Sequence, residues 1–154
     1  MSSRRAFLWG SNANERYTRL RYAKGDARAL GDMLATPRYG FSVEVFDDTS
    51  DPFAVHRALM KASTACGRAD TFIAHFSGHG DIVAGQLHLV LDNSDPDDLS
   101  TLFSSTWLME AFTKCKARHR LLVLDCCHAG AATGARSNGV SVAELLPELQ
   151  SQLV

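Results

Sequence analysis

The stretch "RLLVLDCCHAG", residues 120–130, joins an apolar strand to two adjacent thiols. Residues 121–124 are apolar without interruption, which is typical of a strand covered on both faces in a parallel sheet. Asp125 follows, and then Cys126 and Cys127 stand side by side. One of these thiols could be a nucleophile, both could be metal ligands, or both could simply end a core strand.

The segments around this strand alternate between strand and helix patterns. Strands are predicted at residues 5–10, 41–48, 70–80 and 120–125, with a short extra strand at 86–93; helices are predicted at 21–37, 51–66 and 104–118. This alternation favours right-handed crossovers between parallel strands. We therefore predict an α/β fold, with a mainly parallel sheet of about four to five strands and helices on both faces.

The composition excludes several classes of protein. The chain has 154 residues, which suits one domain, and with 45% hydrophobic and 21% charged residues it is typical of soluble globular proteins. A net charge of -1 gives no electrostatic reason to expect nucleic acid or an anionic membrane as a partner. No apolar run approaches the roughly 18 residues of a membrane span, and the first one is too short for a secretion signal. We expect a cytoplasmic protein.

The other two cysteines, Cys66 and Cys115, each end an apolar helical pattern, so we interpret them as core residues. A zinc site would need separated pairs such as C-x-x-C, and the sequence has none. A disulfide between Cys126 and Cys127 would be strained. The nucleophile and core interpretations of the adjacent pair remain.

Two polar motifs lie at the carboxyl ends of predicted strands, where sites form in open α/β sheets. "HFSGHG" places His79 among the glycines just past its strand, and "DCCHAG" places Cys127 just past the other. A thiol becomes a useful nucleophile when a histidine can take its proton. The pair His79 and Cys127 is therefore the candidate reactive centre.

These motifs resemble the signature pair of the caspase-like cysteine proteases. The metacaspase and prokaryotic branch has S-G-H-G and D-x-C-H-[SA]-G, matched here by "HFSGHG" and "LLVLDCCHAG". The segments "LWGSNAN" and "RLRYAKGDARALGDMLA" resemble the first strand and helix of that family, so the similarity covers residues 7–130. The Q-A-C-[RQG]-G motif of animal caspases is absent.

The resemblance implies a role for each matched residue. Cys127 corresponds to the nucleophile and His79 to the general base and acid, while Cys126 occupies a variable position. The backbone N–H groups of Gly80 and Cys127 would form the oxyanion hole. No metal or organic cofactor is expected for this chemistry.

Asp125 and Asp26 match the two aspartates that line the S1 pocket in the metacaspase branch. Gly25 replaces the asparagine that precedes the second aspartate in that branch. Two carboxylates would select Arg or Lys at P1 through charge-assisted pairing. The simpler alternatives are that Asp26 favours a helix dipole and that Asp125 caps a turn.

The remaining polar residues receive structural interpretations. The acidic loop with Asp92, Asp95, Asp97 and Asp98 could bind calcium, as some metacaspases do, but its spacing is not that of an EF-hand, so we interpret it as a solvated loop. His128 belongs to the family motif and is interpreted as structural. Four further histidines are interpreted as surface or packing residues: His56, His75, His88 and His119.

After the nucleophile motif the sequence becomes small and polar. We assign residues 1–130 to a caspase-like catalytic domain and residues 131–154 to a flexible linker with a weak C-terminal helix. The resemblance implies a small-subunit segment or a second chain that completes the sheet, and a protein substrate. Arg136 lies in "TGARSNG", where loop tips are readily cut, so self-cleavage there is a hypothesis.

Two functions follow. The first is a cysteine endopeptidase that cuts after Arg or Lys. The second is a non-enzymatic scaffold or regulatory half that needs a separate small-subunit chain.

Overall fold

The structure, a computed structural model, describes residues 2–128. These residues form one six-stranded sheet with three α-helices. The strands are β1 (Arg4–Gly10), β2 (Ser42–Phe46), β3 (Thr71–Val83), β4 (Gln86–Leu89), β5 (Phe103–Ser104) and β6 (His119–His128). The helices are α1 (Ala23–Ala35), α2 (Pro52–Thr64) and α3 (Ser105–Lys114), with two short 3-10 turns, η1 (Glu15–Tyr17) and η2 (Leu99–Thr101).

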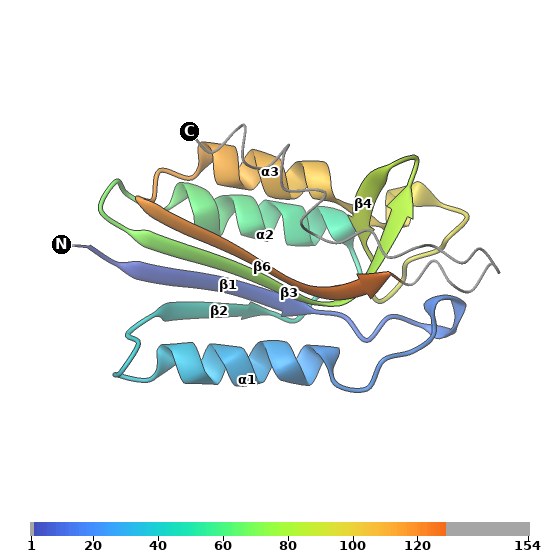
Figure 1. The fold of residues 1–154 in the computed structure, drawn as a ribbon, viewed down its shortest axis with the longest axis horizontal. Helices are drawn as coiled ribbons and strands as arrows, with labels where there is room; N and C mark the ends of the chain where they lie inside the picture. Colours follow the sequence, from blue (N-terminus) through green and yellow to red (C-terminus); the bar gives the residue numbers. More distant parts are fainter. Residues whose placement is uncertain (1, 129–154) are drawn as a thin grey trace.

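The sheet is parallel where it carries the predicted strands. β1 pairs with β2 and β3, and β3 pairs on its other side with β6, all in parallel. The far end of β3 turns into an antiparallel extension with β4 and β5. Helix α1 covers one face of the sheet, and α2 and α3 cover the other (Figure 1). The predicted α/β fold is confirmed.

Alternation along β1 divides the core between the two faces. Phe7 and Trp9 point to the α2 and α3 side, and Ala6 and Leu8 to the α1 side. All four are at most 2% exposed. A strand buried on both faces explains the uninterrupted apolar run in this part of the sequence.

Two local features fix how the helices begin. Asp51 accepts a hydrogen bond from the Phe53 N–H and Pro52 opens α2, as the sequence predicts for an N-cap. Helix α1 begins very close to the end of β1. A Cβ on Gly10 would lie only 2.5 Å from the Ala23 carbonyl oxygen. Glycine is required there by close approach of the two backbones.

Cys66 and Cys115 are confirmed as core residues, 3% and 4% exposed. Burial, reinforced by the neighbouring Cys115 thiol, raises the pKa of Cys66 to about 11. Both thiols therefore belong to the packing between the ends of α2 and α3.

Strand β6 differs from the other parallel strands. Within residues 2–128 its ladder partner is β3, so its second edge is open in this part of the chain. Leu121 is 52% exposed and Val123 36% exposed, both on the face that α1 covers over β1. Among the described residues, the sheet is therefore open beside this strand.

The predicted strand ends are wrong at the polar motifs. β3 continues through the glycines of "HFSGHG" to Val83, and β6 continues to His128. His79 and Cys127 therefore lie within strands and not just past them. The ladder between β3 and β6 is maintained through this region, which keeps both segments extended.

No helix within residues 2–128 has both the length and the apolar character needed to cross a bilayer.

Candidate active site

The register of β3 and β6 brings the two candidate reactive residues next to each other. His79 is paired with Cys127, and Ser77 with Asp125, across the parallel ladder. Neighbouring strands lie about 4.8 Å apart, so the two backbones are as close as a sheet allows. Residues that are 48 positions apart in the sequence thus become direct neighbours.

The imidazole of His79 is held in one orientation. The ring is buried at 7% exposure, and its Nε2 lies 2.7 Å from the Thr18 carbonyl oxygen. A carbonyl oxygen only accepts, so Nε2 carries the proton in the neutral ring and Nδ1 presents a lone pair. Nδ1 is buried and has no hydrogen-bond partner among the described residues. The ring is therefore set to accept a proton at Nδ1.

Thr18 was not among the residues singled out in the sequence, because it acts through its backbone. It follows η1 with φ 66° and ψ 105°, a left-handed conformation that a β-branched residue rarely adopts. The turn is closed by a 2.7 Å hydrogen bond from the Leu20 N–H to the Asn12 carbonyl. A strained residue held by its surroundings is typical of functional sites. Asn14 at the N-cap of η1 is a sequence signal that points to this turn.

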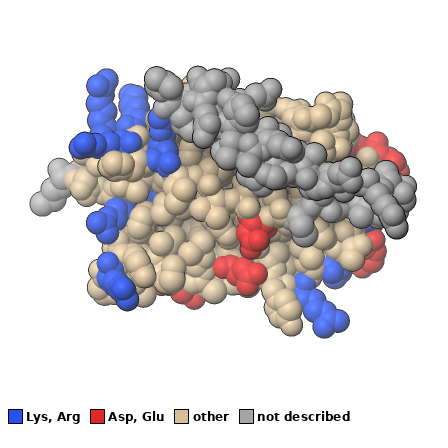
Figure 2. Space-filling view, viewed as in Figure 1, with Lys and Arg blue, Asp and Glu red and all other residues tan. Residues whose placement is uncertain are grey.

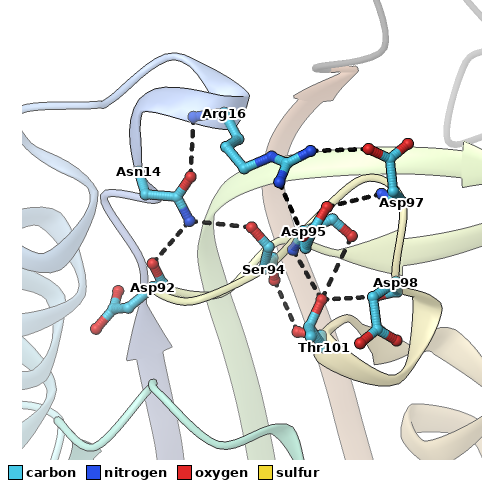
Figure 3. A network of polar contacts seen from close by, with 8 residues as sticks. All are labelled: Asn14, Arg16, Asp92, Ser94, Asp95, Asp97, Asp98 and Thr101. Carbon is cyan, nitrogen blue, oxygen red and sulfur yellow. Dashed lines mark hydrogen bonds and ion pairs between the residues drawn. The ribbon is translucent and has the colours of Figure 1, made fainter.

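The loop that carries Thr18 is anchored by side chains. Asn14 donates hydrogen bonds from Nδ2 to the carbonyl oxygens of Asp92 and Ser94 (Figure 3). The Tyr17 hydroxyl donates to Asp81 on β3, and burial together with this carboxylate raises the pKa of Tyr17. The loop that carries this carbonyl is thus fixed both to β3 and to the segment after β4.

Asp92 connects the ends of three elements near this loop. Its carboxylate accepts hydrogen bonds from the Ser11 and Thr49 hydroxyls and from the Lys24 ammonium, at 2.6–2.8 Å. Burial alone would raise the pKa of Asp92, but these donors outweigh it and hold the pKa below its ordinary value. The carboxylate therefore stays ionised and ties α1 to the strand ends.

The acidic loop is occupied by internal partners. Arg16 binds Asp95 and Asp97 at 2.9 and 2.8 Å, and Asp98 caps η2 (Figure 3). Within residues 2–128, no cluster of three or more His, Cys, Asp or Glu residues has the arrangement of a metal site. The loop's hydrogen bonds favour a structural role for these carboxylates.

Cys126 lies on the opposite side of β6 from Asp125. Its Sγ would be 3.3 Å from a Cβ placed on Gly80, and the side chain packs against the core under α2 and α3. This packing favours its interpretation as the neighbour of the nucleophile. Gly80, the predicted oxyanion-hole residue, is paired with Leu89 on one side and with His128 on the other. Arg136 lies outside the described residues.

The two candidate pocket aspartates converge on a histidine that was interpreted as a packing residue. Asp26 lies in the first turn of α1 and Asp125 on β6, and both side chains are exposed. Between these elements lies His75, which is 5% exposed and has an Nδ1 without a partner in the described chain. Burial lowers the pKa of His75, and the Asp125 and Asp26 carboxylates oppose this shift only in part. The interpretation of His75 as packing alone is incomplete.

Charge is unevenly distributed along the strands. Most Lys and Arg side chains on the face shown in Figure 2 lie at the end where β1 and β6 begin. Exposed cationic residues near that end are Arg4, Arg38, Lys61, Arg68, Lys114, Lys116 and Arg118. Asp26, Asp125 and the acidic loop lie toward the other end. These carboxylates therefore lie at the carboxyl edge of the strands, away from this group of cationic residues.

This fold and this register of motifs define a class of protein. The sequence profile of the caspase domain family matches residues 3–149, and the chain belongs to that family. Membership supports a cysteine-protease-like function. A search of curated proteins gives no match.

A solved structure shows the same fold. The crystal structure of a protein from Geobacter sulfurreducens aligns with a TM-score of 0.65 and 22% identity, over 92% of this chain and 59% of that one. The present chain thus spans less than two thirds of that protein. At this identity the likeness concerns the fold alone.

Proposed function

We propose that this chain is the catalytic portion of a cysteine endopeptidase with a Cys127–His79 dyad. The observation that carries the proposal is the register of β3 and β6, which pairs His79 with Cys127. The Thr18 carbonyl supports it by fixing the proton on Nε2 and leaving Nδ1 as the acceptor. A base oriented by a third group is the usual arrangement for an activated nucleophile.

The chemistry follows from these roles. His79 Nδ1 takes the Cys127 proton, and the thiolate attacks the scissile carbonyl carbon. The backbone N–H groups of Gly80 and Cys127 stabilise the resulting oxyanion. The C–N bond then breaks as His79 returns the proton to the leaving amine, and water, deprotonated by His79, hydrolyses the thioester.

Asp26 and Asp125 would give this protease a preference for Arg or Lys at P1. Both carboxylates are exposed and both act on His75, which supports their placement around one pocket. A guanidinium can bind carboxylates through paired charge-assisted hydrogen bonds. A protein substrate cut after a basic residue is the expected partner.

The open edge of β6 supports the need for a further segment or chain. Exposed Leu121 and Val123 would be covered by the small-subunit part that caspase-like proteins carry, and its strands would pair with β6. The same edge favours the second candidate function, a non-enzymatic half that pairs with a catalytic partner. The Cys127 thiol and His79 base separate the two, because a scaffold does not need them.

Activity-based labelling tests the proposal. Peptides ending in P1 Arg or P1 Asp with a fluoromethyl ketone are incubated with the 154-residue chain, and the adduct is mapped by mass spectrometry. We expect an Arg-directed adduct on Cys127 that is lost in His79→Ala, while Cys126→Ala labels normally. An Asp-directed adduct would refute the basic pocket. If neither peptide labels the protein, the result would favour the scaffold function.

Self-cleavage after Arg136 is a separate part of the proposal. Intact-mass analysis of the purified chain is expected to show a product ending at Arg136, absent from both Arg136→Ala and Cys127→Ala. A product that persists in Cys127→Ala would come from another protease.

A further inference from the structure

We propose that His75 is a third titratable member of the pocket around Asp26 and Asp125, and that its protonation excludes a cationic P1 side chain. This inference rests on the proposed basic pocket and adds a residue that controls it. His75 would be a specificity-determining residue and not a catalytic one, because its action on the substrate is through charge.

The position of His75 is the first argument. It lies on β3 beside Leu8 of β1 and Val123 of β6. Its ring is 5% exposed and its Nδ1 lacks a hydrogen-bond partner within residues 2–128. A buried ring nitrogen without a partner costs free energy, so simple packing does not explain a histidine at this place. An apolar side chain would fill the same volume without that cost.

The charged surroundings are the second argument. The charged groups that act electrostatically on His75 are Asp125 from β6 and Asp26 from α1, while its register neighbour on β1 is the uncharged Leu8. Asp125 is paired with Ser77, two residues along β3 from His75. The two carboxylates predicted to bind a cationic side chain are therefore the same two that act on the imidazole.

Protonated His75 and a cationic P1 side chain would therefore compete for the same two carboxylates. With a neutral imidazole, both carboxylates are available to a guanidinium or ammonium group. A protonated imidazole adds a positive charge that interacts with the same carboxylates, so it repels the incoming cation and weakens their attraction for it. Binding linkage is reciprocal: a bound cation must suppress protonation of His75 by the factor by which protonation weakens binding.

The direction of the pH effect is fixed by burial. Because burial lowers the pKa of His75 below its ordinary value, the imidazole is neutral at pH 7 and takes up its proton only on acidification. Aspartates ordinarily titrate at about pH 3.9. A loss of cation binding that sets in above about pH 5 would therefore report a histidine and not the carboxylates, and the variants below identify which histidine.

The test uses benzamidine as a cationic probe and benzyl alcohol as its neutral counterpart, with the full 154-residue chain. The His75 Cε1–H resonance is titrated by NMR with and without benzamidine, and affinity is measured from pH 7 to 5. We expect benzamidine to lower the apparent pKa of His75, and its affinity to fall about 5-fold or more on acidification. Benzyl alcohol should leave the titration unchanged.

Variants identify which residue causes the loss of benzamidine binding on acidification. His75→Gln, which cannot titrate, should bind benzamidine with nearly the same affinity at both pH values, while the matched control His119→Gln, at the exposed start of β6, should retain the wild-type fall. An identical fall in His75→Gln, or benzamidine binding that leaves the His75 titration unchanged, would overturn the inference while the basic pocket stands. Failure of benzamidine to bind at any pH would refute the pocket itself and this inference with it.

Discussion

Strands β1 and β6 have similar apolar sequences but very different surroundings. In β1 the residues Ala6–Trp9 are at most 2% exposed, with β2 and β3 on either side and helices over both faces. In β6 the described partner strand is β3, and Leu121 and Val123 remain exposed. An uninterrupted apolar run thus predicts a strand with both of its faces buried. We therefore propose that a segment or chain outside residues 2–128 covers β6.

A matched pair of leucines tests this difference most strongly. Leu8→Ala removes a side chain that is 0% exposed, so the free energy of unfolding should fall by about 2–5 kcal/mol. Leu121→Ala removes one that is 52% exposed and should cost less than about 0.5 kcal/mol. Urea denaturation of both variants gives the two values. Equal losses would mean that β6 is as covered as β1.

The loop after β1 should depend on Asp92. Asp92→Asn weakens the charge-assisted bonds from Lys24, Ser11 and Thr49, and should cost about 1.5–3 kcal/mol of unfolding free energy at pH 7. The folded-state pKa is lowered, so the carboxylate's contribution is present above the unfolded pKa and is lost as pH falls through the folded one. The difference between wild type and variant should shrink below about pH 4. A difference that is constant with pH would show that the charge is not responsible.

The close approach of β1 and α1 gives a matched pair of glycines. In Gly10→Ala the new Cβ would meet the Ala23 carbonyl oxygen at 2.5 Å, and relief of that contact should cost about 1–3 kcal/mol. A Cβ on Gly25, in α1, meets nothing within 4 Å, so Gly25→Ala should stabilise by up to about 1 kcal/mol. Thermal unfolding monitored by circular dichroism measures both. Destabilisation in both variants would refute the contact as the cause.

The smallest effect is expected at Thr18. Glycine adopts positive φ without strain, so Thr18→Gly should change the unfolding free energy by less than about 1 kcal/mol and keep the carbonyl that holds His79. Thr18→Pro cannot reach φ 66° and should displace that carbonyl. Labelling of Cys127 is expected to survive the first change and not the second. Equal labelling in both would exclude the carbonyl from orienting the base.

The sequence was sufficient for the elements but not for their ends. Apolar runs and helical spacing predicted β1, β3, β6 and the three helices. The glycines of "HFSGHG" suggested that β3 stops, whereas pairing with β6 and β4 carries it to Val83. Pairing between distant segments outweighs the local preference of glycine, and a sequence does not display such pairing.

The candidate site was likewise predictable from the sequence only in part. His79 and Cys127 were found from their motifs, because side-chain chemistry is visible in a sequence. The Thr18 carbonyl was not, since every residue carries one. His75 could have been found: the alternation of His75, Ser77 and His79 predicts one face of a strand. Its coupling to Asp26 and Asp125 required the crossover of α1 and the register of β6.

The proposed dyad requires His79 to act as the base for Cys127, and the reactivity of that thiol tests this role without a substrate. The rate of iodoacetamide alkylation at Cys127 is measured against pH by mass spectrometry, in wild type and in His79→Ala. We predict a reactive thiol with an apparent pKa well below the ordinary value of about 8.5 in wild type, and a return to about 8.5 in the variant. Identical pH profiles in the two proteins would contradict the dyad.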